Sequence, residues 1–376
     1  MALERIGAGE FIVGQKLSYP VYDDSGKLLL KKGARIASHS QLTSLIERGL
    51  YRSTTMAPEP ESQLETPARQ KEFAFDTLKD ISQRLPLMFE ALTSAKPGAC
   101  DILHRITSDI QRACMSNPDE VLATIHLCHD SKYTVYHPIQ QAILCEIVAA
   151  DMGLSVDTRL SIISAALTAN ISILEMQERF HSQQDALSEE QREVINNHSA
   201  ESARILREAG VTDSTLLDAV MQHHENVNGQ GYPQGFEGEQ ISEAAAILAV
   251  ADRYSAMVSG RAYRKPLTAQ DALRKFFMHR DGVFHEEIAL RFIKELGIYP
   301  PGSFVKLENG ETAIVTRRGK QDRMAPMVCS FMDPNGGMYI KPRKRDSTMS
   351  QYRIKQSCMY DEYDKLNCRM LWNFQE

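Results

Sequence analysis

The sequence predicts a mainly α-helical protein with a small β-rich module at its N-terminus and β-hairpins towards its C-terminus. Three observations carry this prediction. From about residue 73 to residue 296, apolar side chains recur at helical spacing almost throughout. Within residues 10–54, two short strand-like segments flank the turn-rich cluster Asp23–Gly26, as in a hairpin. The segment after Pro300–Gly302 alternates in the same way around further turns.

Length and composition limit the classes of protein that this chain can belong to. Its 376 residues suffice for two or three domains, and 43% hydrophobic with 24% charged residues is typical of a globular protein. The formal net charge of -6 argues against nucleic-acid binding, because phosphate affinity needs a cationic surface. No apolar run approaches the ~20 residues of a bilayer span, and the N-terminus lacks a secretory apolar segment. Seven scattered cysteines without a CxxC pair indicate reduced thiols, so we expect a cytoplasmic protein without a membrane span.

The N-terminal module is predicted to cover residues 1–54. Two short strands should meet at the turn-rich cluster Asp23–Gly26, and a helix over His39–Arg48 should follow and end at Gly49. Nothing in this module indicates a ligand. Residues 55–72 are rich in Pro and Glu and poor in large apolar side chains, so they are predicted to form a linker.

The helical domain is predicted to cover residues 73–296. One of its helices is indicated by apolar residues that recur every four positions, at Val135, Ile139, Ile143 and Ile147. Ser188 and Gln191 have the spacing of a capping box at the start of a later helix, and Gly210 fits the end of that helix. The Gly-rich segment 228–235 should interrupt the helices, which resume near Ile241.

Residues 297–376 are predicted to form a β-hairpin extension and a tail. The first hairpin should turn at Asn309–Gly310, and a second should turn at Asp333–Gly336. The tail, Asp346–Glu376, has no clear pattern.

Histidines on the predicted helical faces are the candidates for chemistry. His198 lies on an apolar stripe, His223 and His224 are adjacent at the end of a helix, Asp252 ends an apolar run, and His137 begins a helix. Imidazole and carboxylate groups suit an iron or manganese hydrolase site. However, a lone buried histidine is more often a hydrogen-bonded core residue, adjacent histidines can complement a helix dipole, and a buried aspartate can pair with a basic neighbour. These residues alone leave both interpretations open.

A resemblance to a known family separates the two interpretations. The segment His223–Pro233, HHENVNGQGYP, closely resembles the HHExxDGxGYP signature of the HD-GYP family. Other segments over about residues 120–345 resemble that family too: YTVYH at 133–137 its YTxxHS helix start, ILAVADRY at 247–254 its RILAVADVYDA helix, RAYRK at 261–265 its RPYRK segment, and YPPGS at 299–303 with NGE at 309–311 its C-terminal extension.

The resemblance implies an all-helical domain with two or three metal ions, usually iron or manganese, that activate water to hydrolyse cyclic di-GMP. By position, it implies metal ligands at His137, His198, His223, His224 and Asp252. It implies contacts of Arg261 and Arg264 with the dinucleotide phosphates, although an exposed charged turn is an equal alternative for these arginines. It also implies that Tyr232 and Pro233 contact the substrate. The loop Gly231, Tyr232 and Pro233 is implied to contact GGDEF-type cyclase domains.

One motif departs from the family pattern. Where the family reads AALLHDIGK, this chain reads AALTANISI, so Ala169 and Asn170 replace the His-Asp pair, Ser172 the glycine and Ile173 the lysine. The lost aspartate would bridge two metal ions, whereas Asn170 offers a neutral carbonyl oxygen and Ala169 offers no donor. No catalytic pair is therefore intact. We expect one iron or manganese ion, or none. Asn228 also replaces the Asp of the DGxGYP segment.

These features favour a non-catalytic module that senses cyclic di-GMP or docks a GGDEF-domain partner through the GYP loop, because losing the bridging carboxylate removes the metal pair that hydrolysis needs. Two alternatives remain open. One is an active cyclic-di-GMP phosphodiesterase with an altered metal site. The other is a structural scaffold that binds no nucleotide and uses its N-terminal module for recognition. Helices in the 75–120 region could pair two chains as a homodimer.

Overall fold

The computed structural model falls into two compact units, residues 1–70 and residues 71–376. The residues that it describes are 3–5, 17, 20–31, 34, 51–53, 73–128, 131–260, 265–278, 282–319, 324–360 and 366–373. The predicted helix over His39–Arg48 and the predicted linker over residues 55–72 lie outside the described residues.

The N-terminal unit contains a four-stranded antiparallel sheet in the order β1-β4-β2-β3. Its strands are β1 (Leu3–Arg5), β2 (Val21–Tyr22), β3 (Leu28–Leu30) and β4 (Tyr51–Ser53). The predicted hairpin at Asp23–Gly26 is confirmed, since β2 pairs with β3 across it. The turn is stabilised locally because Asp23 Oδ1 accepts hydrogen bonds from the backbone N–H groups of Ser25 and Lys27, at 3.0 and 2.8 Å.

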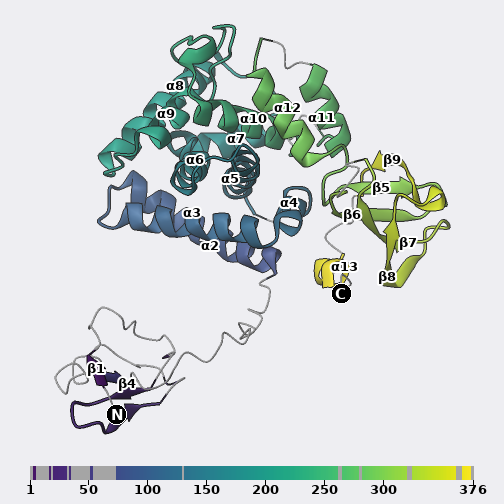
Figure 1. Ribbon diagram of the computed structural model, residues 1–376. Coiled ribbons are helices and arrows are strands. Elements are labelled where there is room, and N and C mark those ends of the chain that lie inside the picture. Colours follow the sequence, from purple (N-terminus) through teal and green to yellow (C-terminus); the bar gives the residue numbers. More distant parts are fainter. Residues whose placement is uncertain are drawn as a thin grey trace. The chain divides into compact units, whose positions relative to one another are not determined.

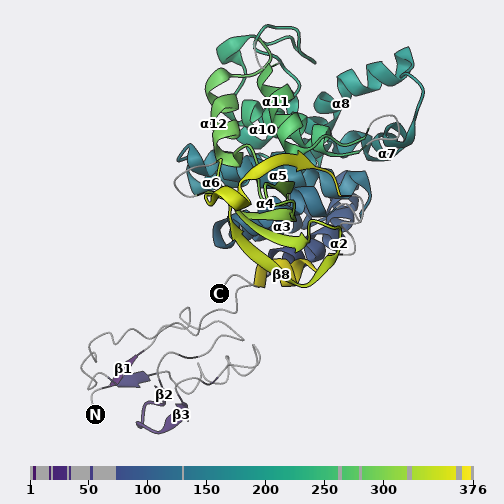
Figure 2. The ribbon, with the colours of Figure 1, turned by 90° about the vertical axis from the view of Figure 1, so that its right-hand side faces the viewer.

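The second unit is mainly helical, as predicted. Helix α5 lies inside the bundle and packs against α6, α10, α3 and α12 (Figure 1, Figure 2). The elements are α2 (Ala74–Thr93), α3 (Ala99–Ser116), α4 (Pro118–Leu127), α5 (Tyr133–Asp151), α6 (Val156–Thr168), η2 (Ile171–Ile173), α7 (Leu174–Ser182), α8 (Glu189–Glu208), α9 (Ser214–Gln222), η3 (Gly238–Gln240), α10 (Glu243–Val258), α11 (Ala269–Met278) and α12 (Glu286–Leu296).

Local signals set the bounds of the helices that carry the site. The predicted capping box at the start of α8 is confirmed: Ser188 Oγ accepts from Gln191 N, and Gln191 Oε1 accepts from Ser188 N. The helix ends before Gly210, which has a φ of +93°. Helix α9 begins in the same way, since the Asp213 side chain accepts a hydrogen bond from Leu216 N.

The C-terminal region is a five-stranded antiparallel sheet in the order β8-β7-β6-β5-β9. Its strands are β5 (Phe304–Leu307), β6 (Thr312–Arg317), β7 (Met327–Met332), β8 (Met338–Asp346) and β9 (Ile354–Cys358). The short helix η4 (Ser350–Tyr352) lies between β8 and β9, and α13 (Cys368–Asn373) follows β9. Both predicted hairpins are confirmed, but the prediction missed β9, which pairs with β5.

The sheet packs on α4 through an apolar cluster that includes Leu127 and Phe304. Gly302 makes this close approach possible. A Cβ at this position would lie 2.6 Å from the backbone oxygen of Ala123 in α4, and the φ of Gly302 is +89°. The two parts of residues 71–376 therefore form one continuous packed structure.

One stretch of the described residues, Val156–Ser182, is apolar and long enough to cross a bilayer by composition, with a mean hydropathy of 1.3. The 3-10 turn η2 interrupts it, and 61% of its most apolar window is buried inside the fold. Core helices of globular domains share this property, so the finding is weak evidence for a membrane span.

Candidate metal centre

Three histidines converge where α8 meets the end of α9. His198 comes from the middle of α8, and His223 and His224 follow the last turn of α9. One nitrogen of each ring lies within 4.8 Å of the others. His198 and His223 are buried, with 2% and 1% of their surface exposed, and His224 is partly buried. The three side chains therefore form a compact set of nitrogen donors.

The hydrogen bonds of two of these rings fix which nitrogen carries the proton. His198 Nδ1 lies 2.5 Å from the carbonyl oxygen of Ile195, and His223 Nδ1 lies 2.7 Å from that of Val220. A carbonyl oxygen only accepts, so each Nδ1 must donate and each Nε2 carries a lone pair. The two Nε2 atoms lie 3.3 Å apart. Two facing lone pairs repel each other unless a cation lies between them.

Burial makes a proton a poor choice for that cation. Desolvation lowers the pKa of His198 to about 4, and the neighbouring His223 lowers it further in the same direction. Desolvation also lowers the pKa of His223 and holds that of His224 well below its usual range. Three neutral imidazoles, two of them with Nδ1 held by a backbone carbonyl, are a familiar ligand set for a first-row divalent ion. The donor set therefore fits one metal ion.

His137 and Asp252 form a second group beside the three histidines. His137 Nε2 lies 3.1 Å from Asp252 Oδ1, and the amide nitrogen of Gln141 lies 2.5 Å from the same carboxylate oxygen and 3.1 Å from His137 Nε2. The hydrogen bond from His137 and the nearby histidines hold the pKa of Asp252 below its usual range, although burial opposes this. Asp252 is thus an ionised carboxylate that already has two partners.

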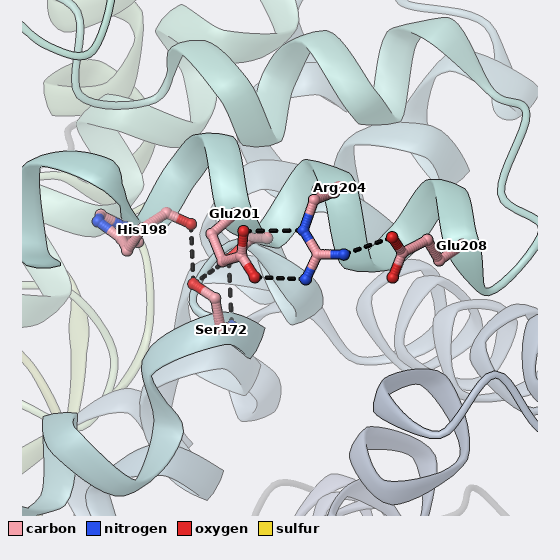
Figure 3. Close-up of polar contacts among 6 residues, drawn as sticks. Ser172, His198, Glu201, Arg204 and Glu208 are labelled. Atoms are coloured by element: carbon pink, nitrogen blue, oxygen red, sulfur yellow. Dashed lines mark hydrogen bonds and ion pairs between the residues drawn. The ribbon is translucent and has the colours of Figure 1, made fainter.

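The positions that carry the His-Asp pair in the HD-GYP family provide no anionic ligand here. Ala169 is fully buried and Asn170 is 6% exposed. Ile173 is also buried, in place of the lysine. Ser172, in place of the glycine, donates to the backbone carbonyl of His198 at 2.8 Å and contacts Ser202 at 2.9 Å (Figure 3). This segment therefore packs against α8 and is hydrogen-bonded to it.

A pocket of about 500 Å³ opens over the two groups. Its wall includes site residues from three helices, His137 of α5, His198 of α8 and Asp252 of α10. Connections between elements contribute Asn170, His224, Tyr232 and residues 183–187. No lysine or arginine lines it in the described part of the chain. Arg261 and Arg264, which the resemblance assigns to phosphate contacts, lie outside the described residues.

The GYP loop (Gly231, Tyr232 and Pro233) folds back on the adjacent residues His223 and His224. Tyr232 N donates to the backbone oxygen of His224 at 3.2 Å, and the two rings lie 4.7 Å apart. The Tyr232–Pro233 peptide bond is cis. A Cβ on Gly231 would lie 2.4 Å from backbone atoms of Glu225, so only glycine fits there. The buried Glu225 carboxylate holds the loop by accepting from the N–H groups of Gln234 and Phe236.

The sequence prediction missed two features of this site. Gln141 lies one helical turn after His137, and this spacing is the signal that could have identified it. Tyr133 lies one turn before His137, and its ring stacks between His137 and His181 with centroids 4.6 Å from each. The second partner, His181, comes from α7, so its position depends on tertiary packing.

Comparisons with known proteins show which proteins this chain resembles. A family model described as an HD domain matches residues 122–283. A cyclic di-GMP phosphodiesterase of Pseudomonas aeruginosa is 27% identical over 235 residues, which are 62% of this chain and 56% of that protein. The cyclic di-GMP phosphodiesterase PdeB of Borreliella burgdorferi is 25% identical over 56% of this chain and 55% of its own length. A 3'3'-cGAMP-specific phosphodiesterase of Vibrio cholerae is 28% identical over 38% of this chain and 33% of its own.

This chain thus spans about half the length of the first two relatives. Among solved structures, an HDG"Y"P protein of Bdellovibrio bacteriovorus has a similar fold, with a TM-score of 0.52 at 16% identity over 78% of this chain and 99% of that one. The motifs, the HD-domain match and this fold lead to one conclusion. Residues 122–283 carry an HD domain, and the chain is similar to HD-GYP proteins in its motifs and in its fold.

Proposed function

We propose that this HD domain binds one divalent metal ion through His198, His223 and His224 and serves cyclic-dinucleotide signalling by binding, without hydrolysis. One observation carries the metal proposal: the Nε2 atoms of His198 and His223 face each other at 3.3 Å while both Nδ1 atoms are held by backbone carbonyls. Iron and manganese are the ions that the family resemblance favours, and a three-nitrogen set suits either.

The absence of hydrolysis is proposed from the ligand set. A two-metal phosphodiesterase needs a carboxylate between the ions, because the paired ions stabilise both the attacking and the leaving oxygen. Ala169 and Asn170 supply no such charge. Asp252 is a carboxylate that lines the same pocket, and it is engaged by His137 and Gln141. An active enzyme with an altered metal site is the alternative.

The proposed ligand is a cyclic dinucleotide. The named relatives act on cyclic di-GMP or on 3'3'-cGAMP. A pocket of about 500 Å³ beside the metal site lies in the usual size range for small-molecule sites. Docking of a GGDEF-domain protein through Gly231, Tyr232 and Pro233 is a second proposed route, and the seven free cysteines agree with a cytoplasmic location.

Titration calorimetry with cyclic di-GMP and, separately, 3'3'-cGAMP tests the binding proposal on the full chain loaded with manganese. We expect saturable binding of one of them and at least tenfold weaker binding by Arg261→Ala. No heat with either nucleotide at high micromolar concentration would leave the scaffold hypothesis as the better account.

A hydrolysis assay on the same preparation tests the second half of the proposal. We expect the nucleotide to remain intact after prolonged incubation with added manganese or iron. Turnover by the wild-type protein that disappears in His223→Ala would show that the altered site is catalytic, and the non-hydrolytic proposal would then be wrong.

A further inference from the structure

A second cavity, of about 210 Å³, lies near the other end of α5. It shares no lining residue with the pocket over the histidines. Glu146 lies nine residues after His137, which is roughly 13 Å further along the helix. Helices α3, α4, α6 and α12 and the residue that follows β6 complete its wall. It is therefore a separate site, and the proposed function does not involve it.

Two charged side chains in this cavity, Glu146 and Arg159, have polar atoms without a hydrogen bond of normal geometry. The side chain of Glu146 is 2% exposed and that of Arg159 is 12% exposed, and Arg159 Nη1 lies 3.3 Å from Glu146 Oε1. Among the described residues, neither carboxylate oxygen of Glu146 accepts a hydrogen bond of normal geometry, and Arg159 Nε finds no acceptor. Leaving charged, buried groups in this state is costly, so the cavity favours an occupant that completes them.

The other charged residues of the cavity have ion-pair partners, although the buried Oδ2 of Asp151 also lacks a hydrogen bond of normal geometry. Arg318 donates to Asp119 at 2.6 Å and to Glu295 at 3.2 Å. Asp151 pairs with Arg291 at 3.5 Å. Most of the unmet hydrogen-bonding capacity of the cavity is therefore on Glu146 and Arg159, which offer one carboxyl acceptor group beside one cationic donor.

We propose that this cavity binds a small zwitterion, an α-amino acid with an apolar side chain. An ammonium group beside a carboxylate gives Glu146 its donor and Arg159 its acceptor through charge-assisted hydrogen bonds, and it leaves the net charge of the cavity unchanged. The remaining wall is apolar and includes Met115, Pro118, Ile147 and Ala150. The volume is below the ~300–1,000 Å³ of drug-sized sites, which restricts the occupant to a small molecule.

Titration calorimetry with L-valine on the full chain tests this site. Isobutylamine and isovalerate, which each lack one of the two charged groups, are the matched ligands. We expect saturable binding of valine in the millimolar range or tighter, at least tenfold weaker binding of both analogues, and at least tenfold weaker binding of valine by Glu146→Gln. Glu208→Gln, which changes an exposed carboxylate of α8, should bind valine as the wild type does. No saturable binding of valine, or equal binding of the analogues, would show that the cavity holds only water.

A second variant tests the same cavity independently, in case Glu146→Gln does not fold. Ala150 lines the cavity and is exposed, so Ala150→Phe should fill the entrance without disturbing the core. We expect this variant to keep the wild-type circular dichroism spectrum and to lose valine binding. Undiminished binding by folded Ala150→Phe would overturn the assignment.

Discussion

At the scale of single residues, the site differs from the family pattern through a few side chains in one short segment. Ala169, Asn170 and Ile173 occupy the buried positions of the family's His, Asp and Lys, while His198, His223 and His224 converge as nitrogen donors. This short segment lies in the turn between α6 and α7. The change is therefore one of ligand chemistry, and restoring the ligands should restore a second metal position.

The double variant Ala169→His with Asn170→Asp tests this expectation. It returns an imidazole and an anionic carboxylate to positions where Asn170 already lines the pocket. We predict about one more equivalent of iron or manganese per chain than in the wild type, measured by elemental analysis after purification with excess metal. An Ala169→Gly control should not change the metal content. An unchanged content in the folded double variant would mean that more than these two residues was lost.

Gly231 is required because of close backbone contact. Its Cβ would lie 2.4 Å from backbone atoms of both Glu225 and Asn226, which cannot move aside as a flexible side chain can. We predict that Gly231→Ala lowers the free energy of unfolding by ~1–3 kcal/mol, in the range of overpacked sites. Urea unfolding measures this loss. Gln230→Ala, at the exposed neighbouring position, should be nearly neutral.

Glu146 should make stability depend on pH. Burial raises its pKa from 4.5 to about 7, with Arg159 opposing this only in part. A folded-state pKa above the unfolded value stabilises the fold at low pH, and this contribution is lost as the pH rises from about 4.5 to about 7. The loss in the wild type, relative to Glu146→Gln, should reach ~3 kcal/mol. Urea unfolding of both proteins at pH 5 and pH 8 measures it. The same difference between the two proteins at both pH values would contradict this account.

At the scale of elements, local signals explain most of what could be predicted. Three kinds of feature depend on residues within a few positions of one another. They are the four-residue repeat of apolar side chains in α5, the capping box of α8, and the hairpin turns at Asn309–Gly310 and Asp333–Gly336. Strand β9 was missed because it pairs with β5, about 50 residues earlier, and its own sequence has no turn signal of this kind. Non-local pairing is the information that such patterns lack.

The capping box offers a test of that local control. Ser188 is the N-cap of helix α8 and lies ten residues before His198. We predict that Ser188→Ala lowers the free energy of unfolding by ~1 kcal/mol, because one backbone N–H loses its acceptor. Thermal or urea unfolding measures the change. Ser182→Ala, at the exposed end of α7, is the matched control and should have a smaller effect. Equal effects would show that the capping box does not stabilise α8.

At the scale of the whole molecule, one buried helix connects two cavities of different chemistry. Helix α5 carries His137 and Gln141 at the histidine pocket and Glu146 at the second cavity. The histidines were identified from the resemblance, since their spacing alone left a hydrogen-bonded core equally open. The roles of Gln141 and Tyr133, and the whole second cavity, depend on how distant helices pack. Sequence patterns do not contain that information.

The central claim is that three histidines hold one metal ion where the family holds two or three. Elemental analysis of the purified full chain, after loading with manganese or iron and removal of excess ion, tests it most directly. The account predicts about one equivalent per chain and its loss in His223→Ala. Two or more equivalents in the wild-type protein, or one equivalent that His223→Ala retains, would contradict it.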